Sequence, residues 1–522
     1  MKVQDKHSCF NKARGINLVT IQALTVRSFA LILAVNNHAP MKSYLLVSLI
    51  PILLLTSCHS NPPADTNPRP NILLFVVDDL GTNDAGCYGN PVIKTPALDA
   101  LAAEGTRFTH AYCSSPSCAA SRSTILTGLH NHATGQYGHS HFEFHFSAFD
   151  FIRSLPVILD SAGYRTMRVG KLHVAPPRTV FRFGDYMPKK EDYPDSVWKH
   201  LDEAPFYPHS GALIPPEQLA EDLKDFLDGD HDDPFFLYFC TWDPHHPFRR
   251  EGSDTIYPAD VIVPDHLPDI PVIREDLARY YMSMQRADRG LQKLKEILTG
   301  SGQWESTLVI FTSDNGRPFP GAKPNLWDPG IRLPFVVKEP GHERPGIVSD
   351  AMISFTDITP TILDYAGVDL GAYRFHGRSF RDQVGRERSL GFDTVFASHT
   401  FHEIQQYYPM RMIRTREYKL IWNLEHEKTF PLGGGSRKFP GFVKENGLDS
   451  LGNRSLQSFL KRPRFELYYL PDDPGEVNNL AGDPEYKGVL ESLRDRLYRF
   501  QEETGDIWAV YRYYDEVIKL RQ

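Results

Sequence analysis

The sequence predicts an α/β fold in which a large, mixed but mostly parallel sheet lies between helices. A smaller C-terminal α+β domain with an antiparallel sheet is expected to follow. Short strand-like runs alternate with amphipathic helical segments up to about residue 381, and closely spaced strand-like runs come after it. Three of the first four runs are continuously apolar, which is typical of strands buried on both faces of a parallel sheet.

Each predicted element follows from its residue pattern. The first four strands are expected at 72–77, 164–169, 235–239 and 308–311; the second is the least regular because it carries two arginines. Helical spacing of apolar residues predicts helices at 95–104, 155–162, 216–227 and 274–299. Further strands are expected at 394–398, 410–415, 418–422 and 465–470, and a helix at 486–502. The pattern indicates a main domain at 71–381 and a second domain at 382–522.

The N-terminal residues predict an exported lipoprotein. Lys42 precedes a mostly apolar run at 44–55, too short to span a bilayer, and small residues follow it up to Cys58. We expect a leader at 1–57 with the lipoprotein signal at 41–57, a lipid on Cys58, and a proline-rich tether at 58–70. The expected location is the bacterial cell envelope, in the periplasm or on the outer membrane. A plain secretory signal or an N-terminal anchor is the alternative, and the start is either Met1 or Met41.

Charge and cysteine content exclude several classes of function. Six of the 57 basic side chains and one of the 65 acidic ones precede Cys58, which leaves 51 against 64 and a net charge of −13. Such a surface repels polyanions, so nucleic acid is not an expected partner. The six cysteines do not form a disulfide framework, and no zinc-type spacing of cysteine and histidine is present.

Polar residues follow all four of the first predicted strands. In open α/β sheets the ligand site lies beyond the carboxyl ends of the strands, so these residues are expected to meet at one edge. An isolated pair of aspartates after a strand is more often a turn or a helix cap, but four such coincidences favour a site. The residues are Asp78 and Asp79, Lys171 and His173, Asp243 and His245, and Asp314 and Asn315.

The acidic residues of this set suit a hard divalent cation. Asp78, Asp79, Asp314 and Asn315 offer three carboxylates and one amide. Such oxygen ligands favour Ca²⁺, with Mg²⁺ second. A cation there can balance the carboxylates and bind an oxygen of an anionic substrate.

A short segment around Cys118 places a thiol and an arginine at a predicted helix start. The run Cys118-Ala119-Ala120-Ser121-Arg122 leads into a helix expected at 121–127. A helix N-terminus favours an anion, and the guanidinium of Arg122 can donate to one. Lys171 and Lys323 add positive charge, and His173 and His245 can move protons near neutral pH. Taken singly, each has an ordinary structural explanation, and His246 could replace His245.

These segments resemble the type I, formylglycine-dependent sulfatases over residues 71–506. The resemblance rests on 70–72 with Asp78 and Asp79, on 95–102, on 118–130, on 308–316 and on 359–364. Within the family the chain is most similar to the sulfamidase group, the N-sulfoglucosamine sulfohydrolases of heparan-type glycans, through 318–320 and through His402-Glu403 followed by 408–411. The resemblance implies the alkaline phosphatase-like fold.

The resemblance also implies a role for each site residue. Cys118 becomes formylglycine, whose hydrated aldehyde attacks sulfur, and residue 118 completes a Ca²⁺ shell formed by Asp78, Asp79, Asp314 and Asn315. The sulfate-binding and proton-transfer roles fall to Arg122, Lys171, His173, His245 and Lys323. Substrate contacts are implied for His402 and Glu403, and we expect His139 and His141 to line the same pocket.

Two positions depart from the family pattern. The common signature has proline where this chain has Ala120, which favours a radical, oxygen-independent maturation enzyme as a partner. The sulfamidases have arginine where this chain has Lys323, whereas most sulfatases have lysine.

The resemblance implies that the substrate is a sulfated saccharide, foremost a sulfamate on glucosamine. The alternatives are an O-sulfatase of host or marine glycans, a phosphatase or phosphonate hydrolase, and a non-catalytic glycan-binding lipoprotein.

Overall fold

The computed structural model of this chain describes residues 69–141, 144–184, 214–229, 232–250, 252–341, 344–431 and 443–513. All of these belong to one compact unit, Asn67–Gln522. The predicted leader, signal and lipid-bearing Cys58 lie outside the described residues, as does most of the tether. Among the described helices, none has the length and apolar character needed to cross a membrane.

A seven-stranded sheet forms the centre of this unit, with the order β3-β4-β1-β5-β6-β2-β7. Its strands are β1 Asn71–Val77, β2 Thr106–Tyr112, β3 Arg165–Gly170, β4 Phe235–Cys240, β5 Thr307–Ser313, β6 Arg332–Lys338 and β7 Ile347–Ser354. The neighbours β3, β4, β1 and β5 are parallel and are the first four strands predicted from the sequence. β6 is antiparallel to β5 and β2, and β2 is parallel to β7. The predicted mixed, mostly parallel sheet is confirmed.

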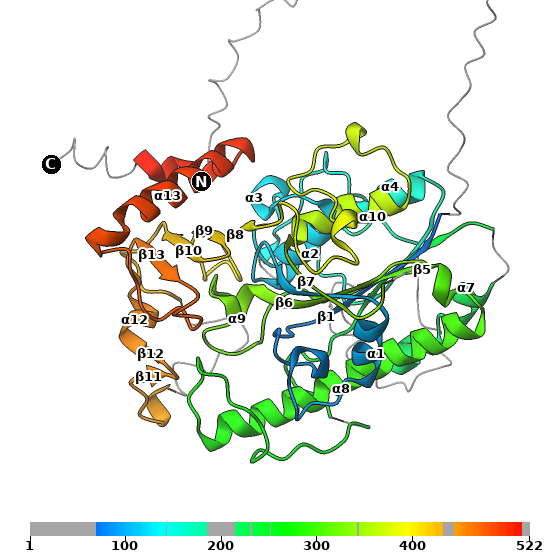
Figure 1. The fold of residues 1–522 in the computed structure, drawn as a ribbon, viewed down its shortest axis with the longest axis horizontal. Coiled ribbons are helices and arrows are strands. Elements are labelled where there is room, and N and C mark those ends of the chain that lie inside the picture. Colours follow the sequence, from blue (N-terminus) through cyan, green and yellow to red (C-terminus); the bar gives the residue numbers. More distant parts are fainter. Residues whose placement is uncertain are drawn as a thin grey trace, which may run out of the picture. The chain divides into compact units, whose positions relative to one another are not determined.

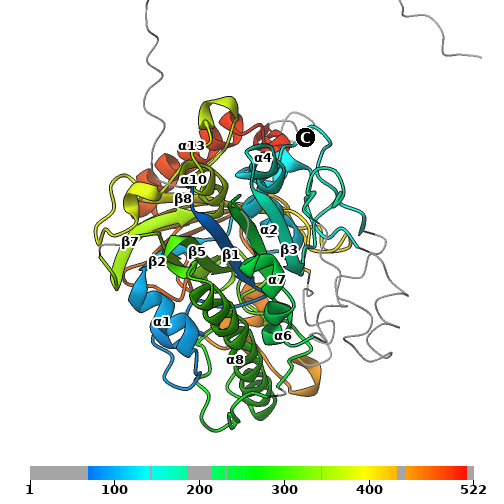
Figure 2. The same cartoon turned by 90° about the vertical axis from the view of Figure 1, so that its right-hand side faces the viewer.

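Helices cover both faces of this sheet, as Figure 1 and Figure 2 show. One face packs against α1 Pro96–Glu104, α6 Pro216–Glu221, α7 Lys224–Asp228 and α8 Pro271–Gly300, and the other against α2 Cys118–Thr127, α4 Leu155–Ser161 and α10 Ile358–Tyr365. Along β1, Leu73 and Phe75 join the first core, whereas Ile72 and Leu74 join the second. Because successive side chains of a strand point to opposite faces, this burial explains the continuous apolar run. The single helix expected at 216–227 is instead two helices, α6 and α7.

A four-stranded antiparallel sheet follows, with the order β13-β10-β9-β8. Its strands are β8 Thr394–His399, β9 Met410–Thr415, β10 Tyr418–Asn423 and β13 Phe465–Tyr469. Leu420 of β10 packs with α13 Lys487–Glu503, whereas the next residue, Ile421, joins the core of the large sheet. The predicted antiparallel C-terminal sheet is confirmed, and the domain boundary after residue 381 stays a prediction. The other α-helices and strands of the described residues are α3 Asn131–Thr134, α9 Asp328–Ile331, β11 Ser450–Leu451, β12 Arg454–Ser455 and α12 Leu456–Leu460.

A buried ion pair ties the C-terminal segment to β9. Arg411 Nε lies 2.5 Å from Asp506 Oδ2, and both side chains are fully buried. Although burial opposes it, the Arg411 guanidinium holds the pKa of Asp506 well below its usual range. The substitution Asp506→Asn leaves a buried guanidinium uncompensated, so we expect it to lower the free energy of unfolding by about 3–5 kcal/mol in urea titrations. The matched change Asp254→Asn, in an exposed pair with Lys94, should leave it almost unchanged. Equal effects of the two changes would contradict this account.

Three stacked histidines beyond the end of α2 make the fold sensitive to acid. His130, His132 and His376 have ring centroids 5.5–5.9 Å apart and lie near Phe500 of α13. Burial lowers the pKa of His132 to about 3 and that of His376 to about 4, and it lowers that of His130 strongly. In the unfolded chain each titrates near 6.5, so below that pH the unfolded state takes up protons that the folded state excludes.

Stability is therefore complete above about pH 6.5 and is lost as the pH falls toward the folded pKa values. At pH 5, each histidine that stays unprotonated in the folded state lowers the free energy of unfolding by about 2 kcal/mol. We expect the melting temperature to fall steeply between pH 7 and pH 5 in calorimetry, and His376→Phe to reduce that slope. A melting temperature that is flat over this range would show that these imidazoles titrate normally in the folded protein.

Candidate active site

The carboxyl ends of the parallel strands bring the predicted site residues together. The register pairs Val77 of β1 with Ser313 of β5, so the aspartates that follow them are neighbours. Likewise, Gly170 of β3 pairs with Cys240 of β4. Gly170 has φ +76°, and a Cβ there would lie 1.7 Å from the Cys240 carbonyl oxygen, so only glycine allows β3 to end here and deliver Lys171 to the site.

An acidic cluster forms the centre of this edge. Ligand atoms of Asp78, Asp79, Cys118 and Asp314 all lie within 4.8 Å of one another, and the four side chains are buried. Asn315 joins them, because its Nδ2 donates to Asp79 Oδ1 at 2.6 Å. The structure therefore brings together every residue that the sequence predicted as a metal ligand.

Three buried cations hold the carboxylates. Arg122 Nε donates to Asp314 Oδ2 at 2.9 Å, and Lys171 Nζ donates to Asp78 Oδ2 at 2.5 Å. Lys323 Nζ lies 2.7 Å from Asp79 Oδ1 and 2.8 Å from Cys118 Sγ. Burial raises the pKa of Asp314, as does repulsion from Asp78, whereas Lys171 outweighs burial and lowers the pKa of Asp78 to about 2.

The donor set fits a divalent cation. Oδ1 of Asp78, Oδ2 of Asp79 and Oδ1 of Asn315 are buried oxygens that accept no hydrogen bond. Burying such oxygens without a partner is costly, and a cation that binds them removes the cost. Three carboxylates face three cationic side chains, so a divalent ion would give the site a net positive charge that suits an anionic substrate.

Cys118 is the first residue of α2, which starts earlier than the predicted 121–127. Ser117 is the residue before the helix, and all ten side chains from Cys118 to Thr127 are buried. Ser121 Oγ donates to the carbonyl oxygen of Asp314 at 2.5 Å, which fixes the first turn against β5. Burial raises the pKa of the Cys118 thiol far above its usual range despite the nearby lysines, so the side chain is a neutral thiol.

The two proton-transfer candidates flank the cluster. His245 Nε2 lies 3.7 Å from Asp79 Oδ2, and burial lowers its pKa. His173 follows β3 with φ +55°, and its Nε2 lies 2.7 Å from His141 Nδ1. Asp79 also has a positive φ, +70°, held by a bond from its amide to Asp314 Oδ1 at 3.1 Å. Such strained backbone is typical of functional sites.

The predicted substrate contacts divide into two groups. His139 Nε2 lies 3.1 Å from His402 Nε2, and His402 Nδ1 lies 2.9 Å from Ser117 Oγ, directly before Cys118. His141 contacts His173, so His139, His141, His173 and His402 lie together near Cys118, and their role as substrate contacts stays a prediction. Glu403 instead accepts a hydrogen bond from Gln405 on its own loop at 2.6 Å.

Sequence reasoning did not identify the residues that support the backbone of Asp79. Arg317 forms an ion pair with Asp84 at 2.5 Å, and Tyr280 of α8 donates to Asp84 Oδ2 at 2.9 Å and to the Asp79 carbonyl oxygen at 3.1 Å. Arg317 lies three residues after Asp314, so the sequence could have indicated that it is near the site. Tyr280 lies in an ordinary amphipathic helix, and nothing in the sequence indicates its role.

Comparison with known proteins finds relatives over most of the chain. Residues 70–368 match the sulfatase family, and residues 322–433 match the family described as N-sulphoglucosamine sulphohydrolase, C-terminal. N-sulphoglucosamine sulphohydrolase of Homo sapiens is 36% identical over 493 residues, or 88% of this chain and 93% of that protein. An ulvan-active sulfatase of Formosa agariphila is 28% identical and covers 84% of this chain and 81% of its own.

Solved structures share the architecture. One, a complex with its substrate D-glucosamine-2-N,6-O-disulfate, has a TM-score of 0.62 at 18% identity and covers 84% of this chain and 99% of that one. Phosphonate monoester hydrolase of Agrobacterium radiobacter has a TM-score of 0.61 at 20% identity and covers 84% of this chain and 96% of that one. At such identities the likeness shows the fold alone, which is alkaline phosphatase-like as expected. Because the family match spans more than half of the chain and a relative is 36% identical over 88% of it, this protein belongs to the sulfatase family and is a sulfate ester or sulfamate hydrolase.

Proposed function

We propose that this sulfatase removes sulfate from a sulfated carbohydrate, foremost the sulfamate of N-sulfoglucosamine in heparan-type glycans. The observation that carries the proposal is the buried cluster of Asp78, Asp79, Cys118 and Asp314, whose ligand atoms lie within 4.8 Å of one another beside three cations. The choice of sugar is supported by the similarity to the human N-sulphoglucosamine sulphohydrolase, which extends over 93% of that protein.

Asp78, Asp79, Asp314 and Asn315 would hold Ca²⁺ together with residue 118. When bound, the ion would stabilise negative charge on the sulfuryl group as a Lewis acid. The all-oxygen character of the four protein ligands favours Ca²⁺ over softer metals, with Mg²⁺ second. Their unpartnered buried oxygens support this assignment.

Residue 118 is proposed to act as formylglycine, produced by oxidation of Cys118. Once formed, the hydrated aldehyde would supply the hydroxyl that attacks sulfur; release of sulfate by its second hydroxyl would then regenerate the aldehyde, which takes up water to form the hydrate again. The neutral, buried thiol of Cys118 is itself a weak nucleophile, which supports the need for this conversion.

The surrounding side chains bind the sulfuryl oxygens and move protons. Lys323 contacts Cys118 Sγ at 2.8 Å, so its ammonium lies where charge develops during transfer. Arg122 and Lys171 reach the same cluster from α2 and from the end of β3. His245 or Lys323 donates the proton to the leaving amine or alcohol, and His173 accepts the proton of the residue 118 hydroxyl that expels sulfate.

An O-sulfatase is the second candidate, because Lys323 stands where the sulfamidases have arginine. The experiment is to measure sulfate release by ion chromatography from glucosamine N-sulfate, glucosamine 6-O-sulfate and a 2-O-sulfated uronate. We expect kcat/KM for the N-sulfate to exceed the others by at least about ten-fold. Faster release from an O-sulfate would select the second candidate, and faster turnover of a phosphate ester would refute both.

We further propose that the protein is a lipoprotein of the bacterial cell envelope, matured by a radical-type formylglycine-generating enzyme. The apolar run that ends at Cys58 supports the first statement, and Ala120 supports the second. The substitution Cys58→Ala should move the protein from the membrane fraction to the soluble fraction and abolish labelling by a fatty acid. Membrane association that survives this change would contradict lipidation at Cys58.

A further inference from the structure

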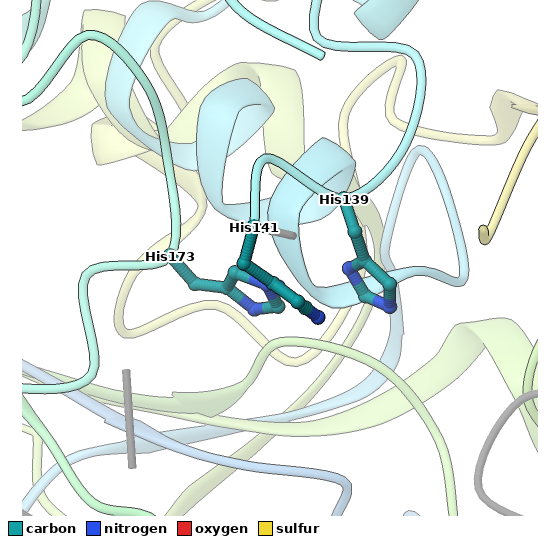
Figure 3. A group of neighbouring side chains, drawn as sticks. All are labelled: His139, His141 and His173. Atoms are coloured by element: carbon teal, nitrogen blue, oxygen red, sulfur yellow. The ribbon is translucent and has the colours of Figure 1, made fainter. Parts of the chain in front are cut away.

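Three histidines beside the active centre form a second group of metal-ligating side chains. His139, His141 and His173 each offer a ring nitrogen, and these nitrogens lie within 4.8 Å of one another. Figure 3 shows His139 and His141 on one loop and His173 on another, with the rings side by side. The ring centroids are 4.7–4.9 Å apart, so two separate stretches of chain converge on one point.

The hydrogen-bonding pattern leaves nitrogens of this group without partners. His139 and His173 are 5% and 9% exposed, yet Nδ1 of each is buried and makes no hydrogen bond. Burial lowers the pKa of both imidazoles. Neutral imidazole is the form that binds transition metals.

Outer contacts orient the rings as they do in metal sites. His139 Nε2 bonds to His402 Nε2 at 3.1 Å, and His402 Nδ1 bonds to Ser117 Oγ at 2.9 Å. When His139 Nε2–H donates to His402 Nε2 and His402 Nδ1–H donates to Ser117 Oγ, the lone pair of His139 Nδ1 is available to a metal ion. Histidine ligands usually use their second nitrogen in this way, which fixes the tautomer.

Zinc binding requires the three rings to shift. Zn–N bonds of about 2.0–2.1 Å in tetrahedral geometry place two ligand nitrogens about 3.4 Å apart, so nitrogens that lie up to 4.8 Å apart here would approach one another around the ion. The bond of 2.7 Å between His141 Nδ1 and His173 Nε2 would open in the process. His141 is only partly buried and gives the group a route to solvent.

We propose that His139, His141 and His173 form a binding site for a transition-metal dication of the Zn²⁺ class, distinct from the oxygen site of Asp78, Asp79, Asp314 and Asn315. Imidazole ligands select Zn²⁺ and its neighbours, whereas the oxygen site selects Ca²⁺. Occupancy of the histidine site removes the lone pair of His173 from proton transfer, so Zn²⁺ inhibits the sulfatase. Binding stands on the histidine geometry, and only the inhibition rests on the proposed role of His173.

Binding is tested without turnover, by calorimetric titration of Zn²⁺ and by the visible absorption of Co²⁺. The titration uses the Cys118→Ala variant in excess Ca²⁺. The substitution removes the thiol, and Ca²⁺ occupies the carboxylates, so neither can bind Zn²⁺ or Co²⁺. We expect one equivalent of Zn²⁺ per chain, and His141→Gln or His139→Leu should weaken binding by at least about ten-fold. His145→Gln, which removes an exposed histidine of the same loop, should leave binding unchanged.

Inhibition is tested on the matured wild-type enzyme in excess Ca²⁺. Zn²⁺ should suppress sulfate release, a chelator selective for transition metals should restore it, and His141→Gln should raise the inhibitory concentration by at least about ten-fold. Melting curves of each variant confirm folding, and the side chain that His141→Gln removes is partly exposed. Zn²⁺ binding that is absent, or equally strong in His141→Gln and His145→Gln, would overturn the site. Binding without inhibition would refute only the proton-transfer role of His173.

Discussion

The substitution Cys118→Ala is expected to reduce sulfate release by at least about 1,000-fold while leaving the fold intact, because loss of a covalent nucleophile costs an enzyme that much or more. Residue 118 is the first residue of α2, and its Sγ lies 2.8 Å from Lys323 Nζ and 3.8 Å from Asp79 Oδ1. The arginine and lysines around it are protonated and cannot act as nucleophiles in its place.

Cys113 provides the matched control for this change. It is fully buried five residues before Cys118, and its Sγ contacts the Gly330 carbonyl oxygen at 3.7 Å instead of the acidic cluster. Cys113→Ala should lose some stability through a small cavity but keep its activity. Sulfate release is measured for both variants alongside melting temperatures. Substantial activity in Cys118→Ala, or equal loss in both variants, would contradict the nucleophile assignment.

The substitution Asp314→Asn is expected to abolish Ca²⁺-dependent activity, with a loss of at least about 100-fold. Asparagine keeps the shape of the side chain, but it removes one of three carboxylates from the cluster and weakens the bond to Arg122 Nε. In the wild type, a chelator should remove activity and Ca²⁺ should restore it more effectively than Mg²⁺. In Asp314→Asn neither ion should restore it, as measured by sulfate release and by calorimetric Ca²⁺ titration.

Asp288 provides the matched control for loss of a buried carboxylate. Its carboxylate accepts hydrogen bonds from the backbone amides of Ala97 and Leu98, at the start of α1 and far in sequence from the cluster. Asp288→Asn should therefore retain Ca²⁺ binding and activity even if its melting temperature falls. Full Ca²⁺-dependent turnover by Asp314→Asn would remove this residue from the metal site.

The sequence predicts the parallel half of the sheet, because strands buried on both faces are continuously apolar. The polar residues that follow these strands predict the site at the edge of the sheet. The antiparallel and outer strands did not follow. β2 carries Arg107 and His110 and is interrupted by a bulge, β6 contains Pro334, and β7 carries Asp350. Each mixes polar and apolar residues without a clean period, so only pairing with a neighbour identifies it as a strand.

The candidate site likewise contains residues that the sequence predicts and contacts that it does not. Asp78, Asp79, Asp314 and Asn315 are found from the sequence because strands that are parallel neighbours must end at the same edge. The contact between Lys323 and Cys118, and the contact between His402 and Ser117, depend on how loops 205 and 285 residues apart in sequence fold back. The position of Lys323 after the fourth strand allows it to fold back over the site, but neither composition nor periodicity predicts which side chain it meets, and the contact between His402 and Ser117 was not predicted.

The most direct test of the account is sulfate release by protein whose conversion at residue 118 has been quantified by mass spectrometry. The account predicts that turnover of glucosamine N-sulfate rises in proportion to the converted fraction, disappears on chelation and returns with Ca²⁺. Fully converted, Ca²⁺-loaded protein that releases no sulfate from N-sulfated or O-sulfated sugars would contradict it.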